Sequence, residues 1–250
     1  MPEQAVSCNR CGGSGWVIIE RDGISGAERC DCVLAGRSQR IEKEAGIPPM
    51  YQNASFDNFL LPADNPTART GLGTVQLTVK NFVREFPNGD RPGLLLVGDT
   101  GTGKTHLAIA ALRALIARGF DGVFFDYQHL FEKIRAGYDD TSGSSDKEAY
   151  RTALEAEVLM IDDLGAQRYK EWVEDTITSL ITYRCNHRKP LIATTNLPDD
   201  ERVLDYKVGT TAVYKKTLAE VIGVRSRSRL HEMCKVVRMP AVEDYRLRRR

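Results

Sequence analysis

Short apolar runs alternate with amphipathic stretches along the chain from residue 93 onward. Each apolar run predicts a buried strand, and each stretch with apolar residues three and four positions apart predicts a helix. The predicted strands are 94–97, 123–125, 158–161, 191–194 and 235–239. The predicted helices between them are 105–118, 128–136, one directly before 158, and 172–188. Such alternation is typical of an α/β fold in which a parallel sheet is covered by helices on both faces.

The first 92 residues follow a different pattern. Residues 37–45 form a charged helical stretch, 47–51 contain two prolines and form a loop, and apolar spacing predicts a helix over 75–86. Residues 1–33 are rich in cysteine and glycine and are too few to bury a core. The predicted division is a cysteine module at 1–33, a helical linker and flanking segment at 34–92, and the α/β core at 93–250.

Composition excludes several classes of protein. The 250 residues carry 35 Lys and Arg against 34 Asp and Glu, and 42% are apolar. This balance excludes a polycation and a highly charged disordered chain. No uncharged apolar run is long enough to span a membrane, and the N-terminus lacks the pattern of a secretory signal. We therefore expect a cytoplasmic protein. Basic residues gather after Arg225, either as a solvated tail or as a group that faces phosphates.

Residues 98–105 read Gly-Asp-Thr-Gly-Thr-Gly-Lys-Thr and fit the phosphate-loop pattern G-x-x-x-x-G-K-[ST] without mismatch. They follow a predicted strand and precede a predicted helix, a context that a chance glycine-rich turn lacks. Glycines let backbone N–H groups approach phosphate oxygens, and the helix N-terminus favours the same anions. We expect Lys104 to reach the β and γ phosphates of ATP and Thr105 to hold Mg²⁺. The predicted nucleotide-binding residues are Gly98, Asp99, Thr100, Gly101, Thr102, Gly103, Lys104, Thr105 and His106.

The strand predicted at 158–161 ends in two carboxylates, Asp162 and Asp163. In phosphate-loop NTPases an aspartate at this place completes the Mg²⁺ site, and we assign that role to Asp162. A second carboxylate can orient or deprotonate the attacking water, so Asp163 is the candidate base. The alternative is a solvated Asp-Asp turn. Asn196 follows the next strand and can hydrogen-bond the γ phosphate or the water, although Asn-Leu-Pro is also an ordinary turn sequence.

Together, the phosphate loop, Ile-Asp-Asp-Leu-Gly at 161–165 and Thr-Thr-Asn at 194–196 resemble the AAA+ ATPases. Within that class the chain resembles the bacterial replicative helicase loaders of the DnaC/DnaI type and the related IstB transposition helpers. Arg-Ser-Arg-Ser-Arg-Leu at 225–230 is similar to the family's arginine-bearing helix before the last strand. Asp-Tyr-Arg at 244–246 is similar to its terminal sensor motif, and the resemblance covers about residues 45–246.

The resemblance implies an AAA+ core without a separate helical lid, because few residues follow the last predicted strand. Asp163 stands where most AAA+ enzymes have glutamate, and its shorter side chain makes slow turnover the expectation. An arginine finger reaches the ATP of a neighbouring subunit, so Arg229 implies self-association. The alternative is that the arginines at 225–229 form an exposed basic helix face. The implied catalytic residues are Lys104, Asp162, Asp163, Asn196 as sensor 1, Arg229 as arginine finger and Arg246 as sensor 2.

Four cysteines lie close together near the N-terminus as Cys8-x-x-Cys11 and Cys30-x-Cys32. Four thiolates fit a tetrahedral structural Zn²⁺ site, with an iron–sulfur cluster or free thiols as alternatives. Cys185 and Cys234 lie apart from them and are expected to be small buried residues. By resemblance, the N-terminal region of a loader holds the helicase, and the alternative for this module is a small nucleic-acid-binding knuckle.

The resulting hypothesis is an ATPase that loads a hexameric replicative helicase and binds single-stranded DNA through its AAA+ core. The helix at 128–138 carries Phe131, Lys133, Arg135 and Tyr138, a mixture suited to base stacking and phosphate contact, or to core packing with a solvated face. Two alternatives remain open for the whole chain. One is an IstB-like transposition helper that acts on duplex DNA, and the other is an adaptor that binds nucleotide without hydrolysing it.

Overall fold

The computed structural model of the chain describes residues 8–12, 14, 16–21, 24–136, 145–166, 171–199, 204–208 and 211–247. Five strands form one sheet in the spatial order β4-β5-β6-β3-β9, and every neighbouring pair is parallel. The predicted parallel sheet is therefore confirmed. Its strands are β3 (Gly93–Val97), β4 (Gly122–Asp126), β5 (Val158–Asp162), β6 (Leu191–Thr195) and β9 (Cys234–Arg238).

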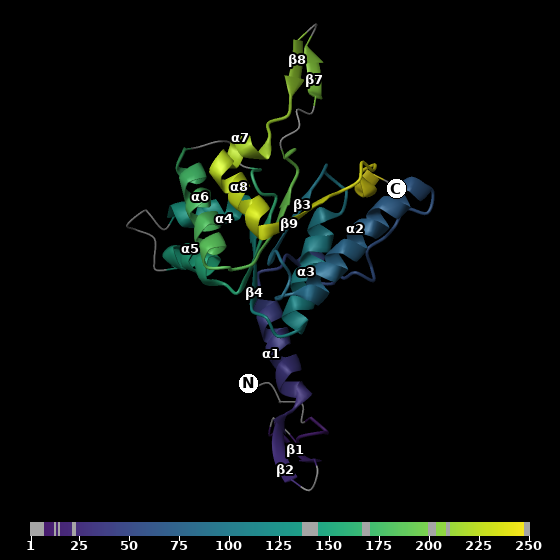
Figure 1. The fold of residues 1–250 in the computed structure, drawn as a ribbon, viewed down its shortest axis with the longest axis vertical. Coiled ribbons are helices and arrows are strands. Elements are labelled where there is room, and N and C mark those ends of the chain that lie inside the picture. Colours follow the sequence, from purple (N-terminus) through teal and green to yellow (C-terminus); the bar gives the residue numbers. More distant parts are fainter. Residues whose placement is uncertain are drawn as a thin grey trace.

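Alternating side chains along the strands point to opposite faces of the sheet, and each face carries a hydrophobic cluster. Leu94 and Leu96 of β3 pack toward α2 and α3, whereas Leu95 and Val97 belong to the cluster that includes α4, α6 and α8. Figure 1 shows α2 and α3 on one side of the sheet and α4 to α8 on the other. The helices of the core are α2 (Pro66–Glu85), α3 (Lys104–Ala117), α4 (Tyr127–Ala136), α5 (Ser145–Glu155), α6 (Glu171–Asn186), α7 (Leu218–Ile222) and α8 (Val224–Met233).

Helix α2 begins nine residues before the start that apolar spacing predicts. Asn65 caps it, because its side-chain oxygen accepts a hydrogen bond of 2.9 Å from the N–H of Ala68, and Pro66 occupies the first turn. Three threonines in the early turns bond back to carbonyl oxygens four residues earlier. The first half of α2 is rich in glycine and threonine, so apolar spacing does not predict it as a helix. Its cap and its packing stabilise it.

Two antiparallel hairpins, neither of which apolar patterning predicts, lie at opposite ends of the longest axis of the molecule (Figure 1). Strands β1 (Trp16–Arg21) and β2 (Ile24–Arg29) form one, next to helix α1 (Asp31–Glu44). Strands β7 (Leu204–Val208) and β8 (Thr211–Tyr214) form the other. Helix α1 joins the first hairpin to the core, where the Ser38 hydroxyl donates to the carbonyl oxygen of Ile116 on α3.

After β9, the described residues contain one short 3-10 helix, η2 (Tyr245–Leu247), and no helical lid. A second short 3-10 helix, η1 (Pro49–Tyr51), lies in the predicted loop before α2. Within the part of the chain that the structure describes, none of the helices has the length and apolar character needed to cross a membrane.

Candidate nucleotide-binding site

The segment 98–105 connects β3 to α3 and lies at the carboxyl end of the sheet. Gly101 and Gly103 have positive φ angles of 75° and 92°, which glycine adopts without a steric penalty. Gly103 is also the N-cap of α3, and a Cβ there would lie 2.6 Å from the ring of Phe59. The loop therefore has the strand-to-helix setting and the backbone that a phosphate loop requires.

Lys104 is the first residue of α3, and only 4% of it is exposed. Its ammonium group donates a hydrogen bond of 2.7 Å to the carbonyl oxygen of Asp99, across the loop. Burial lowers the pKa of Lys104, while the carboxylates of Asp163 and Asp162 act in the opposite direction. The cation is thus held beside two acids at the bottom of the loop.

Asp162 ends β5 and is joined to the phosphate loop through Thr105. The Thr105 hydroxyl donates to Oδ1 of Asp162 at 3.0 Å, and the Thr194 hydroxyl donates to the same oxygen at 2.6 Å. Burial raises the pKa of Asp162, and these two hydrogen bonds oppose the rise. A hydroxyl and a carboxylate oxygen side by side are hard ligands that suit Mg²⁺. The residues present therefore fit a magnesium–nucleotide complex.

Asp163 and Asn196 come from the ends of the neighbouring strands β5 and β6, and their side chains meet. The Asn196 amide donates a hydrogen bond of 3.0 Å to Oδ1 of Asp163. Asp163 has a positive φ of 52°, and its N–H donates to the hydroxyl oxygen of Thr194 at 2.9 Å. A non-glycine residue held in this conformation is uncommon and is found preferentially at functional sites. The carboxylate is thus aimed by its backbone and its amide partner together.

His106 faces the segment before α2. One of its ring nitrogens lies 2.9 Å from the carbonyl oxygen of Ser55, and its ring centroid is 5.6 Å from that of Phe59. Tyr51 is also near the site, since Asp162 is among the charges that raise the pKa of its hydroxyl, after burial. Residues 51–59 therefore line the flank of the phosphate loop.

The last described residues lie on the phosphate loop and bring Arg246 to it. The N–H of Tyr245 donates to the carbonyl oxygen of Gly101 at 3.2 Å. A Cβ on Gly101 would lie 2.0 Å from the carboxyl carbon of Asp244, so only glycine fits under this segment. Asp244 also forms an ion pair of 3.3 Å with Arg246. We call residues 240–247 the C-terminal strap.

Arg229 lies outside this assembly of residues. Its guanidinium pairs with Glu232 one turn later on α8, at 2.7 Å, and its side chain is 37% exposed. Among the described residues, no hydrogen bond joins it to the phosphate loop or to Asp162 and Asp163. Arg227 on the same helix instead bonds Asp199, which leaves Arg229 and the exposed Arg225 as the arginines that α8 presents outward.

Three residues that organise the site were assigned no role from the sequence. Thr194 holds both aspartates, Lys215 forms an ion pair of 3.0 Å with Asp99 of the phosphate loop, and Asp244 packs on Gly101. For Thr194 the sequence did contain a signal. Its hydroxyl lies at the end of a buried strand next to the strand that ends in Asp162, where few other hydrogen-bond partners are available. No local pattern identifies Lys215. Asp244 lies in the Asp-Tyr-Arg motif at 244–246, but that motif does not indicate its contact with Gly101.

The four N-terminal cysteines come together as predicted. Their sulfur atoms all lie within 4.8 Å of one another, with Cys8 and Cys30 at 3.7 Å and Cys11 and Cys32 at 3.4 Å. A tetrahedral Zn²⁺ with bonds of about 2.3 Å requires sulfur atoms about 3.8 Å apart, so the cluster fits this ion. Elsewhere, Cys234 is buried as expected and Cys185 is half-buried.

The structure decides between the two interpretations of Phe131, base stacking and core packing. Phe131 on α4 is completely buried and packs edge-on against Tyr127 and Trp172, with ring centroids 4.8 and 5.7 Å away. It is a core residue and cannot stack on a base. Lys133 and Arg135 are exposed on the same helix, whereas Tyr138 lies outside the described residues.

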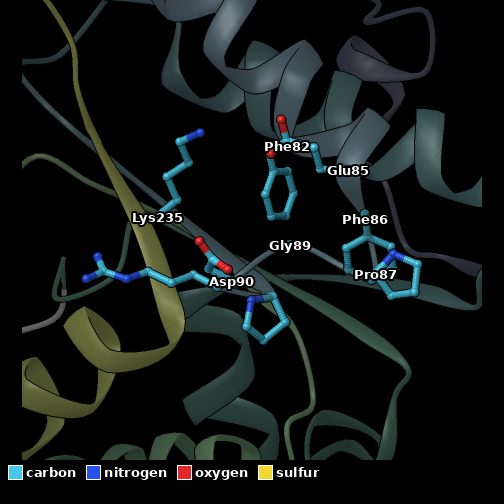
Figure 2. A pocket seen from close by; sticks show the side chains of 9 residues that line it. Phe82, Glu85, Phe86, Pro87, Gly89, Asp90 and Lys235 are labelled. Atoms are coloured by element: carbon cyan, nitrogen blue, oxygen red, sulfur yellow. The ribbon is translucent and has the colours of Figure 1, made fainter.

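A cavity of about 250 Å³ lies at the amino ends of β3 and β9, away from the phosphate loop. Figure 2 shows the Phe82 ring, the Asp90 carboxylate and the Lys235 side chain around it. Its charged residues have both signs, so its electrostatics do not select an anionic or a cationic ligand.

The fold and the site together define a nucleotide-binding protein of the AAA+ class. Residues 75–249 match the model of the IstB-like ATP binding protein family, which is more than half of the chain. The chain therefore belongs to this family.

Similar proteins include known helicase loaders. The uncharacterized protein YqaM of Bacillus subtilis (strain 168) is 28% identical over 215 residues, which make up 84% of this chain but only 61% of YqaM. The replicative helicase loader DnaC of Escherichia coli (strain K12) is 24% identical over 176 residues, 70% of this chain and 69% of DnaC. A crystal structure of the DnaC helicase loader is 29% identical, with a TM-score of 0.60, and the match covers 77% of this chain and 100% of that one.

Proposed function

We propose that this protein is an ATPase that loads a replicative DNA helicase and that ATP hydrolysis switches it between two states. The observation that carries the ATPase activity is the meeting of Thr105 with Asp162 and of Asn196 with Asp163 at one end of the sheet, each at 3.0 Å. The similarity to DnaC helicase loaders supports the role in loading. A role in replication also places the protein in the cytoplasm.

In this proposal the phosphate loop binds the triphosphate, and Lys104 exchanges the Asp99 carbonyl for phosphate oxygens. Thr105 and Asp162 would hold Mg²⁺, which neutralises developing charge on the phosphates when it is bound. Asp163 accepts the proton of the attacking water, and Asn196 keeps its carboxylate aimed at that water. Aspartate reaches less far than glutamate, so we expect slow turnover.

Two arginines would complete the site from different chains. Arg246 stays beside the phosphate loop of its own chain, because the C-terminal strap is bonded to Gly101. Arg229 is half-exposed on α8, and among the described residues it pairs with Glu232 and not with a residue of its own site, which suits an arginine finger that serves a neighbouring subunit. Self-association is therefore part of the proposal, and a finger of this kind accelerates hydrolysis by about 10³- to 10⁵-fold in other NTPases.

The N-terminal part would bind the helicase. In the proposed division, residues 1–33 form a Zn²⁺ module, residues 34–92 form a helical linker and flanking segment, and residues 93–250 form the ATPase core. Helix α1 begins at Asp31 and includes Cys32, so a metal-bound module would be continuous with the helix that reaches α3. Movement of the core would thus be transmitted to the helicase through a rigid connection.

The test is a binding and turnover experiment with the full chain. We expect ATP hydrolysis to be weak alone and to rise with single-stranded DNA or with the hexameric replicative helicase of the same host. We also expect the chain to co-elute with that helicase on size exclusion. If the original chain shows no ATP hydrolysis that Asp163→Asn can abolish, the non-hydrolysing adaptor is favoured. In that alternative the bound nucleotide only stabilises a scaffold.

The family match itself favours a second candidate, an IstB-like transposition helper. Such a protein would prefer duplex DNA to single strands and would retain a transposase in place of a helicase. Turnover measured with matched single- and double-stranded oligonucleotides, followed by capture of either purified partner, separates the two functions.

A further inference from the structure

Asp199 is a buried carboxylate on which two arginine side chains and one histidine side chain converge. Its side chain is only 2% exposed, and Nε of Arg227 lies 2.7 Å from Oδ1. Nε2 of His231 lies 3.0 Å from the same oxygen, and Nη2 of Arg238 lies 3.5 Å from Oδ2. A carboxylate so far removed from water is costly unless it is paired, so these contacts fix its position.

These three side chains come from two elements that follow the site in the chain. Arg227 and His231 are four residues apart on α8 and therefore share one face of that helix, and Arg238 ends β9. The hydrogen bonds from Arg227 and His231 outweigh burial and hold the pKa of Asp199 below its ordinary value. The carboxylate is therefore charged at neutral pH, and it fastens α8 to the segment after β6.

That segment also carries Asn196. Asn196 contacts Asp163 at 3.0 Å, and the Leu218 N–H at the start of α7 donates to the carbonyl oxygen of Pro198 at 2.8 Å. The residue that touches the candidate base and the residue that anchors α8 are therefore only three positions apart in the chain. A shift of Asn196 when the γ phosphate is present or lost would move Asp199 with it.

We propose that Asp199 is a positioning residue that couples the end of β6 to α8, so that the state of the nucleotide sets the position of Arg229. The inference rests on the proposed function, because it gives Arg229 a role in the site of a neighbouring subunit. In this role Asp199 acts through Arg227 and His231, which it contacts on α8. It makes the arginine finger depend on the nucleotide that its own chain holds.

The test compares ATP binding and turnover in the self-associated full chain with single-stranded DNA present. Asp199→Asn keeps the size of the side chain and removes its charge, and Arg227→Gln removes a cation whose side chain is 25% exposed, which makes it the milder change. We expect each to lower kcat, by about 100-fold for a displacement of about 1 Å, while the Kd for ATP changes less than about threefold. Arg84→Gln, an exposed arginine on α2, is the matched control.

The double variants decide between positioning and mere stability. As a single variant, Arg229→Ala should lower kcat. Adding Asp199→Asn or Arg227→Gln to it should lower kcat little further, because these substitutions act through Arg229 itself. Multiplied losses, or a Kd for ATP that weakens in step with kcat, would overturn the inference. If Arg229→Ala itself leaves turnover unchanged, the arginine-finger role within the proposed function fails. If Arg229→Ala lowers turnover while the Asp199 and Arg227 variants do not, only the coupling fails.

Discussion

The side-chain amide of Asn196 donates a hydrogen bond of 3.0 Å to the carboxylate of Asp163, so the ends of two adjacent strands are joined at the point where the phosphate loop lies. This contact accounts for the orientation of an aspartate whose φ is positive. Removing either partner should therefore affect hydrolysis more than binding, because neither residue lies on the phosphate loop itself.

Asp163→Asn should lower kcat by about 100-fold or more, because a positioned base contributes about 10²- to 10⁴-fold. Asn196→Ala should cost less, since the carboxylate remains and only its aim is lost. Phosphate release, with nucleotide binding measured by titration, checks both. Glu157→Gln changes an exposed carboxylate directly before the same strand and should leave turnover unchanged. A Kd for ATP that rises as much as kcat falls would contradict this interpretation.

Thr194 is fully buried and bonds both aspartates, so its hydroxyl should matter for stability and for metal use. Thr194→Val keeps the shape and leaves the Asp163 N–H without an acceptor, which should lower the free energy of unfolding by about 1–3 kcal/mol. The Mg²⁺ concentration for half-maximal turnover should rise. Denaturant unfolding and a Mg²⁺ titration measure these effects. Thr194→Ser keeps the hydroxyl and should behave much more like the original chain; equal losses in the two variants would refute the role of the hydroxyl.

Four of the five core strands were predictable because each contains an unbroken apolar run of the kind that a covered parallel sheet requires, whereas β9 carries charged residues at its second and last positions. The phosphate loop and the two aspartates were predictable for a related reason, since their spacing follows from local chemistry at strand ends. Helix α2 was predicted too short, because threonines and glycines obscure its first half and its cap replaces the missing apolar signal. Phe131 was ambiguous, because an aromatic residue on an amphipathic helix has the same pattern whether it faces a core or a base.

The contacts that Lys215, Asp244 and Asp199 make with distant segments could not be predicted. The ion pair of Lys215 with Asp99 and the packing of Asp244 on Gly101 join residues more than one hundred positions apart. The cluster around Asp199 depends on how α8 turns before β9, which fixes the face that Arg227 and His231 share. Such relationships are properties of the packed sheet and its connections, and no run of neighbouring residues encodes them.

Gly101→Ala should displace the C-terminal strap from the phosphate loop. A methyl group there would lie 2.0 Å from the carboxyl carbon of Asp244, and alanine at a φ of 75° is strained by about 1–3 kcal/mol. We expect weaker ATP binding and slower turnover, because Arg246 moves with the strap. Adding Asp244→Gly should restore part of the loss by removing the overlap. Gly89→Ala meets only ordinary contacts and is the control; no relief in the double variant would show that the strap is not the cause.

The cysteine cluster should bind one Zn²⁺ per chain. Elemental analysis of the purified protein measures this, and Cys11→Ser should abolish it, because a structural site requires all four ligands. Cys185→Ser is the control, since Cys185 lies outside the cluster and is half-buried. Removing the ion with a chelator should release a bound helicase while leaving ATP binding intact. Iron in place of zinc, or full metal content in Cys11→Ser, would contradict the assignment.

Replacing Arg184, a residue of α6, should affect the stability of the fold and not the chemistry of the site. It is completely buried, and one terminal nitrogen donates to the carbonyl oxygens of Ala153, Leu154 and Ala156 at 2.9–3.1 Å, while the other donates to Pro190. These bonds close the end of α5 and fix the turn before β6. Arg184→Met leaves several buried carbonyl groups without donors and should lower the free energy of unfolding by about 3 kcal/mol or more.

The pKa of Arg184 determines how the loss of unfolding free energy in Arg184→Met depends on pH. Burial lowers the pKa of Arg184 from 12.5 to about 10 in the folded chain. Both values lie above neutrality, so folded and unfolded chains bind the same proton below about pH 9 and the loss should be equal at pH 6 and pH 8. Arg151→Met, at an exposed position on α5, should change stability by less than about 0.5 kcal/mol. Denaturant unfolding at both pH values tests this, and a loss in Arg184→Met no larger than that of the control would show that the carbonyl groups find other donors.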